Sequence, residues 1–598
     1  MASYETRDYD VLVVGAGGAG LRAAIEASAL GVKTGLVCKS LLGKAHTVMA
    51  EGGMAAAVAS VDPEDTWRVH FRDTMKGGKM LNHWRMAQLH AMESPERVRE
   101  LQEWGAIFDR TAVGGISQRA FGGHTYKRLC HVGDRTGLEM IRTLQDRGVH
   151  AGMDVHMECT ITHLLKDGER IAGAFGYFRE SGLFVLFRAK AVVLATGGVG
   201  KAFKVTSNSW EYTGDGHVLA YEAGADMVDM EFMQFHPTGM VWPPSVRGTL
   251  VTEGVRGDGG VLKNSKGERF MFSYIPEAFK NDVAASEEEA SRWLAGDKQA
   301  RRPPELLTRD VCARAIVSEV REGRGSPHGG VLLDIAYMDS EYVKRRLPSM
   351  HHQFMELAGM DITKEPMEVG PTAHYAMGGV RVDPETQAAT VPGLFAAGEA
   401  AGGMHGANRL GGNSLSDLVV FGRRAGQGAA EYAKSLREKP RVNLAEAEAC
   451  AKELLESFNR SEGENPFVVH EALQDMMEKN AGIVRNEKDL RAAIDALAGL
   501  RKRASGVKVS GTRQYNPGWN EAIDLKNLLT VSELLARAAL ERKESRGAHT
   551  REDYPDYDKA FAKVNVVIRR RDGAMQVAQE PLPEMPDELK KLLEGESA

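Results

Sequence analysis

A glycine-rich segment near the start of the chain has the spacing of a nucleotide-binding loop. Residues 15–20 (GAGGAG) fit the pattern GxGxxG and lie between an apolar run, Val11–Val14, and a stretch of helical character, Leu21–Leu30. In that context Gly15, Gly17 and Gly20 let the backbone approach a pyrophosphate, which then lies at the N-terminus of the following helix. The alternative is an ordinary tight turn between a strand and a helix. The flanking elements favour dinucleotide binding.

The nucleotide is predicted to be FAD rather than NAD. A nicotinamide site places an acidic residue at the end of the second strand, but the run Thr34–Cys38 leads into Lys39 and Ser40. Two later segments repeat the strand-then-glycine pattern, residues 191–198 (AVVLATGG) and 393–399 (GLFAAGE). In the second, the carboxylate of Glu399 could accept hydrogen bonds from ribityl hydroxyls. Three such elements in this order favour FAD.

The elements around these loops indicate an α/β fold with further units. The first strand, glycine loop, helix and second strand predict a β-α-β unit. Residues 82–104 have helical periodicity, and short strands are expected between about 150 and 195. Residues 232–356 are mixed and turn-rich, and within them the charged segment 283–304 is interpreted as a surface insertion. Long amphipathic helices are expected after residue 431, for example Leu444–Phe458 and Glu521–Arg542.

Composition limits the class of protein. A chain of 598 residues predicts two to four structural units. The net charge of -6 argues against a nucleic-acid-binding protein. The five cysteines form no CxxC pair, so neither an internal iron–sulfur cluster nor a metal site is expected, and a reducing compartment is favoured. No apolar stretch reaches the roughly 18 residues of a membrane span, and the first ten residues lack a signal-peptide pattern.

Several motifs resemble the succinate dehydrogenase and fumarate reductase flavoproteins. The matching segments extend in order from about residue 8 to about 575. They are 45–53 (AHTVMAEGG), 235–239 (FHPTG), 252–260 (TEGVRGDGG), 308–310 (TRD), 374–379 (HYAMGG), 405–415 (HGANRLGGNSL), 544–549 (ESRGAH) and 553–555 (DYP).

The resemblance implies a domain organisation. An FAD-binding, Rossmann-like domain (1–231 and 357–430) is interrupted by a capping domain (232–356). A helical domain (431–545) and a small C-terminal segment (546–598) follow. The site of chemistry is expected between the flavin and the cap. No function is predicted for the insertion or for the last residues.

The resemblance also assigns substrate-binding residues. Succinate carries two carboxylates, so its site needs cationic and hydroxyl donors at both ends. By family position, His236 and Thr252 hold one carboxylate, and His374 and Arg409 hold the other. Arg409 suits this task because its planar fork can donate two parallel hydrogen bonds. Phe121 matches an aromatic residue that lines the site.

The proton shuttle of the family falls on Arg309, with Arg256 and Glu253 as its relay. Arginine ordinarily has a pKa above about 12 and is a poor base. The role therefore requires burial and nearby cations that favour proton release, and a proton that moves along the relay in concert with the hydride.

His46 matches the residue that attaches FAD covalently in the family. Bonding to the flavin withdraws electron density, which raises the reduction potential and helps the flavin take electrons from succinate. The alternative is a histidine that only packs near the ring. Ala45 and Lys44 depart from the serine and arginine that are common at these positions. The residues expected to hold FAD are His46, Gly15, Gly17, Gly20, Lys39, Ser40, Thr47, Gly52, Gly53, Asp215, Glu399, Asn413, Ser414 and Leu415.

The predicted function is the flavoprotein subunit of succinate dehydrogenase, which acts in the tricarboxylic acid cycle. Electrons would leave through an iron–sulfur subunit to a membrane anchor with quinone, at the cytoplasmic face of the membrane. Fumarate reductase of the same architecture is the alternative, and Glu51 hints weakly toward it. L-Aspartate oxidase is less favoured, because it lacks the attachment histidine. The direction, the quinone and the number of anchor subunits are not encoded in these motifs.

Overall fold

The predicted β-α-β unit is present at the start of the chain. Strand β2 (Val11–Val14) leads through the glycine loop into α1 (Gly18–Ala29), and β3 (Thr34–Val37) runs parallel to β2. The computed structural model describes residues 4–594. The ends of the predicted domains, 1–3 and 595–598, therefore lie outside the described residues.

All three predicted strand-and-glycine elements join one parallel sheet. Its order is β18-β11-β2-β3-β7, with β18 at Leu394–Ala396, β11 at Ala191–Leu194 and β7 at Asp154–His156. The side chains of β2, β3, β11 and β18 are all buried, as expected for a parallel sheet covered on both faces. Since β18, β11 and β2 are neighbours, their glycine loops meet at one edge of the sheet.

Helices α1 and α11 (Asn413–Ser435) pack closely beside this sheet. The contact depends on small residues. A Cβ at Gly422 would lie 2.6 Å from the carbonyl oxygen of Ala19, and one at Gly426 would lie 2.3 Å from that of Ala23. The N-terminus of α11 thereby reaches the edge where the glycine loops meet.

A second, four-stranded sheet extends the FAD-binding part in the order β1-β10-β9-β8. Its strands are β1 (Tyr4–Asp8), β8 (Cys159–Asp167), β9 (Arg170–Phe178) and β10 (Phe184–Arg188). Three further helices belong to this part: α2 (Trp67–Gly77), α3 (Trp84–Glu103) and α4 (Thr136–His150). The helix expected within 82–104 is therefore confirmed.

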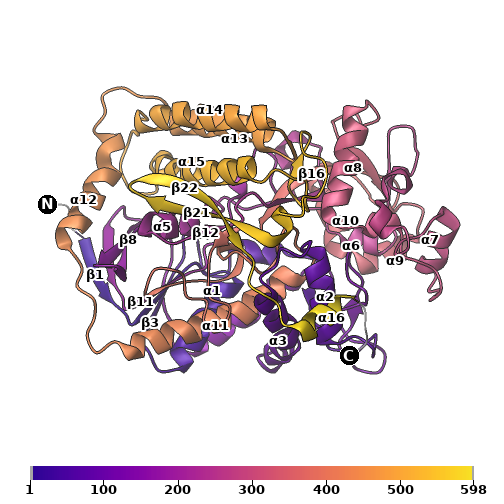
Figure 1. The fold of residues 1–598 in the computed structure, drawn as a ribbon, viewed down its shortest axis with the longest axis horizontal. Helices are drawn as coiled ribbons and strands as arrows, with labels where there is room; N and C mark the ends of the chain where they lie inside the picture. The colour runs from indigo at the N-terminus through magenta and orange to yellow at the C-terminus, as the bar shows by residue number, and fades with distance from the viewer. Residues whose placement is uncertain (1–3, 595–598) are drawn as a thin grey trace.

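The cap is built on its own antiparallel sheet, in the order β13-β16-β15-β14. The strands are β13 (Met233–Met240), β14 (Val261–Lys263), β15 (Val331–Asp334) and β16 (Met367–Ala376), and the helices are α6 (Gly254–Gly257), α7 (Glu287–Leu294), α8 (Arg309–Arg321), α9 (Ser340–Arg346) and α10 (Pro348–Ala358). These helices form the right-hand part of the molecule (Figure 1). The segment 283–304 contains α7; its residues 285–288 are exposed, as predicted for a surface insertion, whereas both of its ends are buried.

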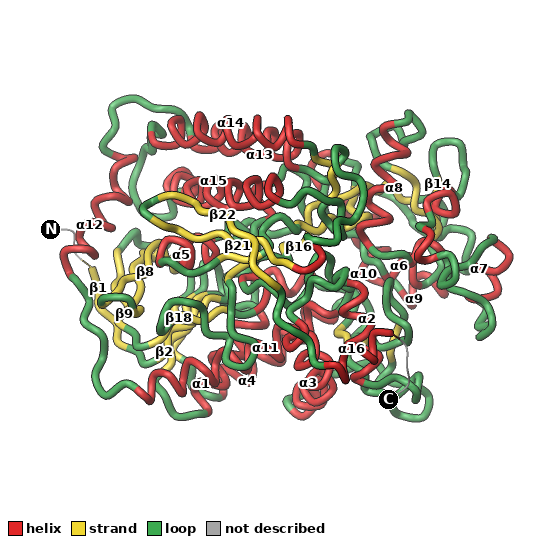
Figure 2. The backbone as a smooth tube through the Cα atoms, in the orientation of Figure 1, coloured by secondary structure: helices red, strands yellow, loops and turns green. Residues whose placement is uncertain are grey.

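Long helices follow, as the amphipathic pattern predicted: α12 (Leu444–Leu455), α13 (Pro466–Ala481), α14 (Glu487–Ser505) and α15 (Pro517–Glu541). In Figure 2 the last three lie along one side of the molecule. The C-terminal hairpin β21 (Val564–Arg571) and β22 (Ala574–Pro581) pairs with β12 (Met227–Val228) in the order β17-β12-β21-β22, where β17 is Gly379–Val380. A final helix, α16 (Asp587–Glu594), packs on α2.

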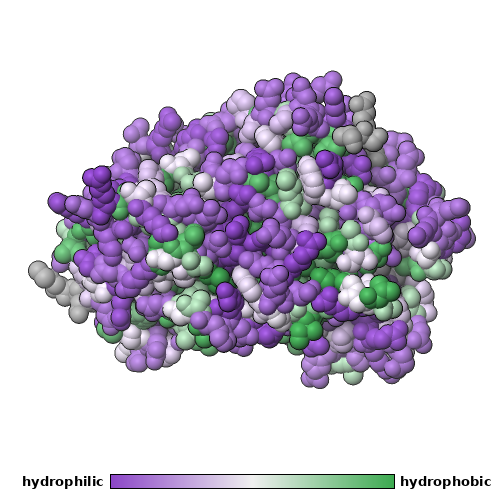
Figure 3. All heavy atoms as spheres, turned by 90° about the horizontal axis from the view of Figure 1, so that it is seen from below, coloured by the Kyte–Doolittle hydropathy of each residue, from purple (hydrophilic) through white to green (hydrophobic). Residues whose placement is uncertain are grey.

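The surface is mainly hydrophilic, with apolar side chains in scattered groups on the face shown in Figure 3. Among residues 4–594, no helix combines the length and the apolar character that a membrane span requires.

Candidate active site

A cavity lies where the parallel sheet meets the cap. The glycine loop, the segment around His46 and the loops after β11 and β18 form its walls on the FAD-binding side. His236, Thr252, Glu253, Arg309 and His374 line it from the cap side or the adjoining strand β16.

The glycine loop allows no side chains at its two ends. Gly15 has φ 109°, and a Cβ there would lie 2.2 Å from the carbonyl oxygen of Ala195. A Cβ at Gly20 would lie 1.7 Å from the carbonyl oxygen of Gly15. Gly15 and Gly17 line the cavity in front of α1, whereas Gly20 supports the loop from beneath. This arrangement fits a pyrophosphate at the N-terminus of a helix.

Lys39 takes the position where a nicotinamide site would have an acid. Its ammonium donates to Asp215 at 3.0 Å and to Asp524 at 2.6 Å, and all three side chains are largely buried. Burial alone lowers the pKa of Lys39, but the two carboxylates outweigh it, so the pKa is raised. Asp524 comes from α15, so the helical part of the chain holds Lys39, which lines the cavity.

Glu399 lies directly after β18, as predicted. Its carboxyl accepts a hydrogen bond from the backbone N–H of Ala376 at 2.9 Å and faces Gly198, where a Cβ would lie 2.1 Å away. Burial raises the pKa of Glu399 to about 8. The side chain can therefore act as a donor or an acceptor toward hydroxyl groups in the cavity.

His46 begins the short 3-10 helix His46–Met49 beside the glycine loop. The backbone N–H of Ser209 donates to its Nδ1 at 3.3 Å, Asn208 lies 3.2 Å from its Nε2, and Tyr212 packs edge-on against its ring. Burial lowers the pKa of His46 to about 4. The imidazole is thus neutral in the folded protein.

Arg409 is anchored on both sides. Its Nη1 donates to the hydroxyl of Ser414, its Nη2 donates to Gln234 Oε1 at 3.2 Å, and its guanidinium lies 4.3 Å from the centre of the Tyr375 ring. Burial, followed by the charge of Arg309, lowers the pKa of Arg409. A cation held in this way is well suited to an anionic ligand.

His236 and His374 face each other with ring centres 5.2 Å apart. Burial, followed by the charge of Arg309, holds the pKa of each well below its usual range. Ser207 contacts Nδ1 of His374 at 2.8 Å. Two neutral imidazoles beside two arginines can donate hydrogen bonds to a carboxylate without adding charge.

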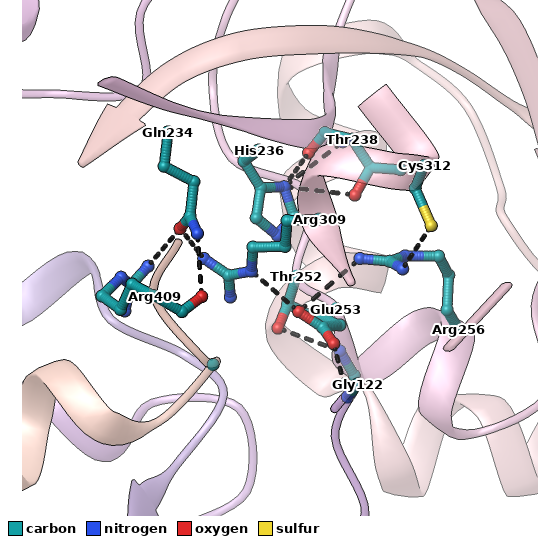
Figure 4. A network of polar contacts seen from close by, with 12 residues as sticks. Gly122, Gln234, His236, Thr238, Thr252, Glu253, Arg256, Arg309, Cys312 and Arg409 are labelled. Atoms are coloured by element: carbon teal, nitrogen blue, oxygen red, sulfur yellow. Dashed lines mark hydrogen bonds and ion pairs between the residues drawn. The ribbon is translucent and has the colours of Figure 1, made fainter. Parts of the chain in front are cut away.

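Arg309, Glu253 and Arg256 form a continuous buried network (Figure 4). Arg309 Nε donates to Glu253 Oε2 at 2.9 Å, and Arg256 Nη2 lies 3.6 Å from the same oxygen. The backbone N–H of Gly122 donates to the other oxygen at 2.8 Å. Burial raises the pKa of Glu253, but Arg309 and Arg256 outweigh it and the pKa is lowered.

The environment of Arg309 answers the chemical objection to an arginine base. Burial lowers the pKa of Arg309. The carboxylate of Glu253 raises it and the charge of Arg256 lowers it further, so that the pKa stays below its usual value. Arg309 is the first residue of α8, where the positive end of the helix dipole also disfavours a cation.

The structure brings most predicted residues together and places three elsewhere. Those that line the cavity are Gly15, Gly17, Lys39, Ser40, His46, Thr47, Gly52, Gly53, Phe121, Asp215, His236, Thr252, Glu253, Arg309, His374, Glu399, Arg409, Ser414 and Leu415. The other three do not line the cavity. Gly20 lies under the glycine loop, and Arg256 lies behind Glu253. The side chain of Asn413 contacts His70 and Thr74.

Gln234, Tyr375 and Asp524 were not predicted. Gln234 precedes His236 by two residues on β13, so the alternation of a strand could have indicated it. Gln234 Oε1 accepts from both Arg309 and Arg409, at 3.1 and 3.2 Å (Figure 4). No sequence pattern indicated Asp524, because it lies 485 residues from its partner Lys39 in the sequence.

Known proteins share this sequence and architecture. Residues 10–415 match the family "FAD binding domain", and residues 470–590 match "Fumarate reductase flavoprotein C-term". The chain is 44% identical to a component of the fumarate reductase (CoM/CoB) of Methanothermobacter marburgensis, over 92% of this chain and 95% of that protein. It is 38% identical to the succinate dehydrogenase flavoprotein of Coxiella burnetii, over 98% of each chain.

A solved structure agrees. Sdh1 of Mycobacterium smegmatis, in complex with UQ1, superposes with a TM-score of 0.85 at 56% identity, over 98% of this chain and 96% of that one. The glycine loop, the buried cavity and the arrangement of FAD-binding, capping, helical and C-terminal parts are those of a flavoprotein oxidoreductase. The chain therefore belongs to the FAD-dependent succinate dehydrogenase and fumarate reductase flavoprotein family.

Proposed function

We propose that this chain is the flavoprotein subunit of succinate dehydrogenase and oxidises succinate to fumarate. One observation carries the proposal. Arg309 and Arg409 line the cavity beside two neutral histidines, and both donate to the same acceptor, Gln234.

The substrate is proposed to lie across this wall. Arg409 and His374 hold one of its carboxylates, and His236 and Thr252 hold the other, while Phe121 closes the apolar side. The carboxylates would compensate the buried charge of Arg409, whose guanidinium contacts a hydroxyl and an amide oxygen rather than a carboxylate.

Arg309 accepts the proton in this proposal. The FAD that these residues would hold would supply the acceptor for a hydride from one methylene carbon of succinate. The neighbouring carbon releases a proton to Arg309 as Arg309 Nε gives up its own proton to Glu253 Oε2, 2.9 Å away. Arg256, beside the same oxygen, gains one proton as it releases another, and bulk water takes up the proton that leaves the relay. Burial and the helix terminus favour that release, so the proton does not accumulate on Arg309.

His46 is proposed to bind FAD covalently. Its low pKa supports this proposal, because a neutral imidazole has the lone pair that a new bond to carbon requires. The bond would keep FAD in place and raise its potential. The test is an acid-denatured gel viewed for flavin fluorescence, with His46→Ser as the control. A wild-type band without fluorescence contradicts covalent attachment.

Electrons are proposed to leave through an iron–sulfur subunit to a membrane anchor with quinone, with the chain peripheral at the cytoplasmic face. All five cysteines are buried and unpaired, which supports an acceptor outside the chain. Purification of the native complex, followed by identification of its subunits, tests this assignment. Recovery of active protein without any iron–sulfur subunit contradicts it.

Fumarate reductase is the second candidate. Two observations favour it: the 44% identity to a methanogen fumarate reductase component, and Glu51, which is buried in the cavity wall and whose burial holds its pKa well above its usual range. L-Aspartate oxidase is disfavoured by His46. Rates of succinate oxidation and of fumarate reduction, measured on the purified complex with dyes and with quinones, distinguish the two directions. An FAD-loaded protein inactive in both directions contradicts the enzyme assignment.

A further inference from the structure

Three buried histidines lie behind the segment that carries Arg409. They are His70 on α2, His90 on α3 and His124 in the loop after Phe121, and we call them the histidine row. His70 and His90 are fully buried and His124 is 5% exposed. The ring of His70 lies 5.1 Å from that of His90 and 6.0 Å from that of His124. Neither the proposed chemistry nor FAD binding uses these three side chains.

Each member of the row contacts the segment 411–416 through the same ring nitrogen, Nε2. His124 Nε2 lies 2.8 Å from the carbonyl oxygen of Gly411. His70 Nε2 lies 2.9 Å from Asn413 Oδ1, and His90 Nε2 lies 2.8 Å from Ser416 Oγ. The three contacts therefore reach the loop at Gly411 and the first turn of α11 at Asn413 and Ser416.

The position of the proton on His124 follows from its partners. Arg128 Nη1 lies 3.3 Å from His124 Nδ1, and a guanidinium can only donate, so Nδ1 must accept. The proton of the neutral ring is then on Nε2, which donates to Gly411. Asp65 and Asp73 hold Arg128 in place by ion pairs of 2.7 and 2.8 Å. Burial, followed by the charge of Arg128, lowers the pKa of His124 to about 4, which agrees with a neutral ring.

The other two members are donors for similar reasons. The amide nitrogen of Asn413 donates to Thr74 Oγ1 at 3.1 Å, which turns the amide oxygen toward His70 as an acceptor. The hydroxyl of Ser416 donates to the carbonyl oxygen of Asn413 at 3.2 Å, so its lone pairs face His90. Nδ1 of His70 and Nδ1 of His90 are buried and have no partner among the described residues, as expected when the proton is on Nε2.

The segment held in this way carries the contacts of the site. Ser414 within it accepts the hydrogen bond from Arg409. A Cβ at Gly411 would lie 2.5 Å from the ring of Phe121 and 3.2 Å from Arg309 Nη2, so the backbone there fits tightly against both. A shift of a few tenths of an ångström in this segment would move the anchor of Arg409.

We propose that His70, His90 and His124 act as a row of Nε2–H donors that positions the segment 409–416, and with it Arg409, for binding of the dicarboxylate. They are positioning residues and do not touch the substrate. The part of the proposal that concerns the dicarboxylate rests on the proposed function; the part that concerns the segment does not.

Paired substitutions test the donor atom rather than the side chain. His124→Gln keeps an amide donor near the position of Nε2, whereas His124→Asn places its amide near the position of Nδ1. The same pair is made at His90. In the FAD-loaded protein, the Asn variants are expected to raise KM for succinate about threefold to tenfold, the worth of one buried hydrogen bond, with a smaller change in kcat. The Gln variants should stay within about twofold of the wild type.

His549 is a matched control. It is fully buried, its Nδ1 accepts from Arg485 Nη1 at 2.9 Å and its Nε2 contacts the carbonyl oxygen of Arg542 at 3.0 Å, but it does not line the cavity. His549→Asn and His549→Gln should leave KM for succinate unchanged.

Hydrogen exchange of the amides in 409–416, measured by mass spectrometry, provides a readout without turnover. Exchange should become faster in the His124→Asn and His90→Asn variants and return toward the wild-type rate in the Gln variants. Equal exchange and equal KM in the Asn and Gln variants would overturn the proposal, because packing alone would then explain the row. If the wild type does not bind succinate, the proposed function fails, and the exchange pattern still decides whether the row holds the segment.

Discussion

Arg309 Nε lies 2.9 Å from Glu253 Oε2, in a pair that is almost fully buried. The guanidinium of Arg309 has a fixed orientation: its Nε faces Glu253, while its Nη1 donates to Gln234 Oε1 at 3.1 Å. In the proposed mechanism, one guanidinium thus connects the substrate with the proton path. This geometry would let Arg309 gain one proton as it releases another.

Replacing Arg309 should abolish turnover without loss of FAD. Arg309→Lys keeps a positive charge but cannot contact Gln234 and Glu253 at once, so kcat should fall by about 10² to 10⁴. Succinate:dye reductase assays and the ratio of flavin to protein check this outcome. Arg321→Ala, on the exposed face of the same helix, is the control. Substantial activity in Arg309→Lys would refute the shuttle role.

Gln234 should be needed although it carries no charge. Gln234→Leu removes the oxygen that both arginines share, so their mutual repulsion is no longer compensated, and we expect KM to rise about tenfold or more with a fall in kcat. Steady-state kinetics with succinate measure both constants. Gln427→Leu, at a half-buried position of α11 outside the cavity, is the control. Unchanged constants would mean that substrate alone organises the two arginines.

Lys39 should govern retention of FAD. Lys39→Met leaves Asp215 and Asp524 buried without their cation, at a cost of about 3–5 kcal/mol. We expect lower flavin content and a lower thermal midpoint. The double variant Lys39→Met/Asp524→Asn should recover part of the flavin content and part of the thermal midpoint, because one uncompensated charge is removed. Failure of the double variant to recover would show that the ammonium has another essential contact.

Acid should destabilise the protein through its buried histidines. The folded-state pKa of His124 is lowered to about 4, against about 6.5 in the unfolded chain. The unfolded state therefore takes up a proton first as pH falls, and stability is lost between pH 6.5 and 4, by about 3 kcal/mol for this residue. The thermal midpoint of His124→Gln should fall less than that of the wild type between pH 7 and pH 4.5.

A second histidine variant serves as the control for the pH dependence of the thermal midpoint. His352 is exposed on α10, and His352→Gln should retain the wild-type dependence of the midpoint on pH. An identical pH dependence in His124→Gln would contradict a neutral His124 in the folded state.

The sequence predicted those parts of the fold and site that depend on short-range patterns. The three strand-and-glycine elements were visible because each is contiguous, and a parallel sheet then places their loops at one edge. His46, Arg309 and Arg409 were indicated by motifs, and their cluster in one cavity agrees with that expectation. Their assigned roles, and the domain boundaries, remain predictions that the experiments above address.

Contacts that join distant segments were not predictable in the same way. Asp524 meets Lys39 only because α15 packs against the FAD-binding part. The lowered pKa of Arg309 arises from burial between two domains, which no local pattern encodes. Gln234 was predictable in part. Its place on a strand with His236 follows from a short-range pattern, but its contacts with Arg309 and Arg409 join distant segments.

The order of the parallel sheet constrains how the protein is made. Strand β11 pairs with β18, and the whole cap is inserted between them in the chain. A ribosome must therefore release residue 396 before the sheet can close, and residue 524 before Lys39 meets its second carboxylate. At about 5–20 residues per second, the nascent chain exposes an unfinished sheet for tens of seconds. The edge of the sheet that carries the three glycine loops is therefore complete only after about two thirds of the chain has been made.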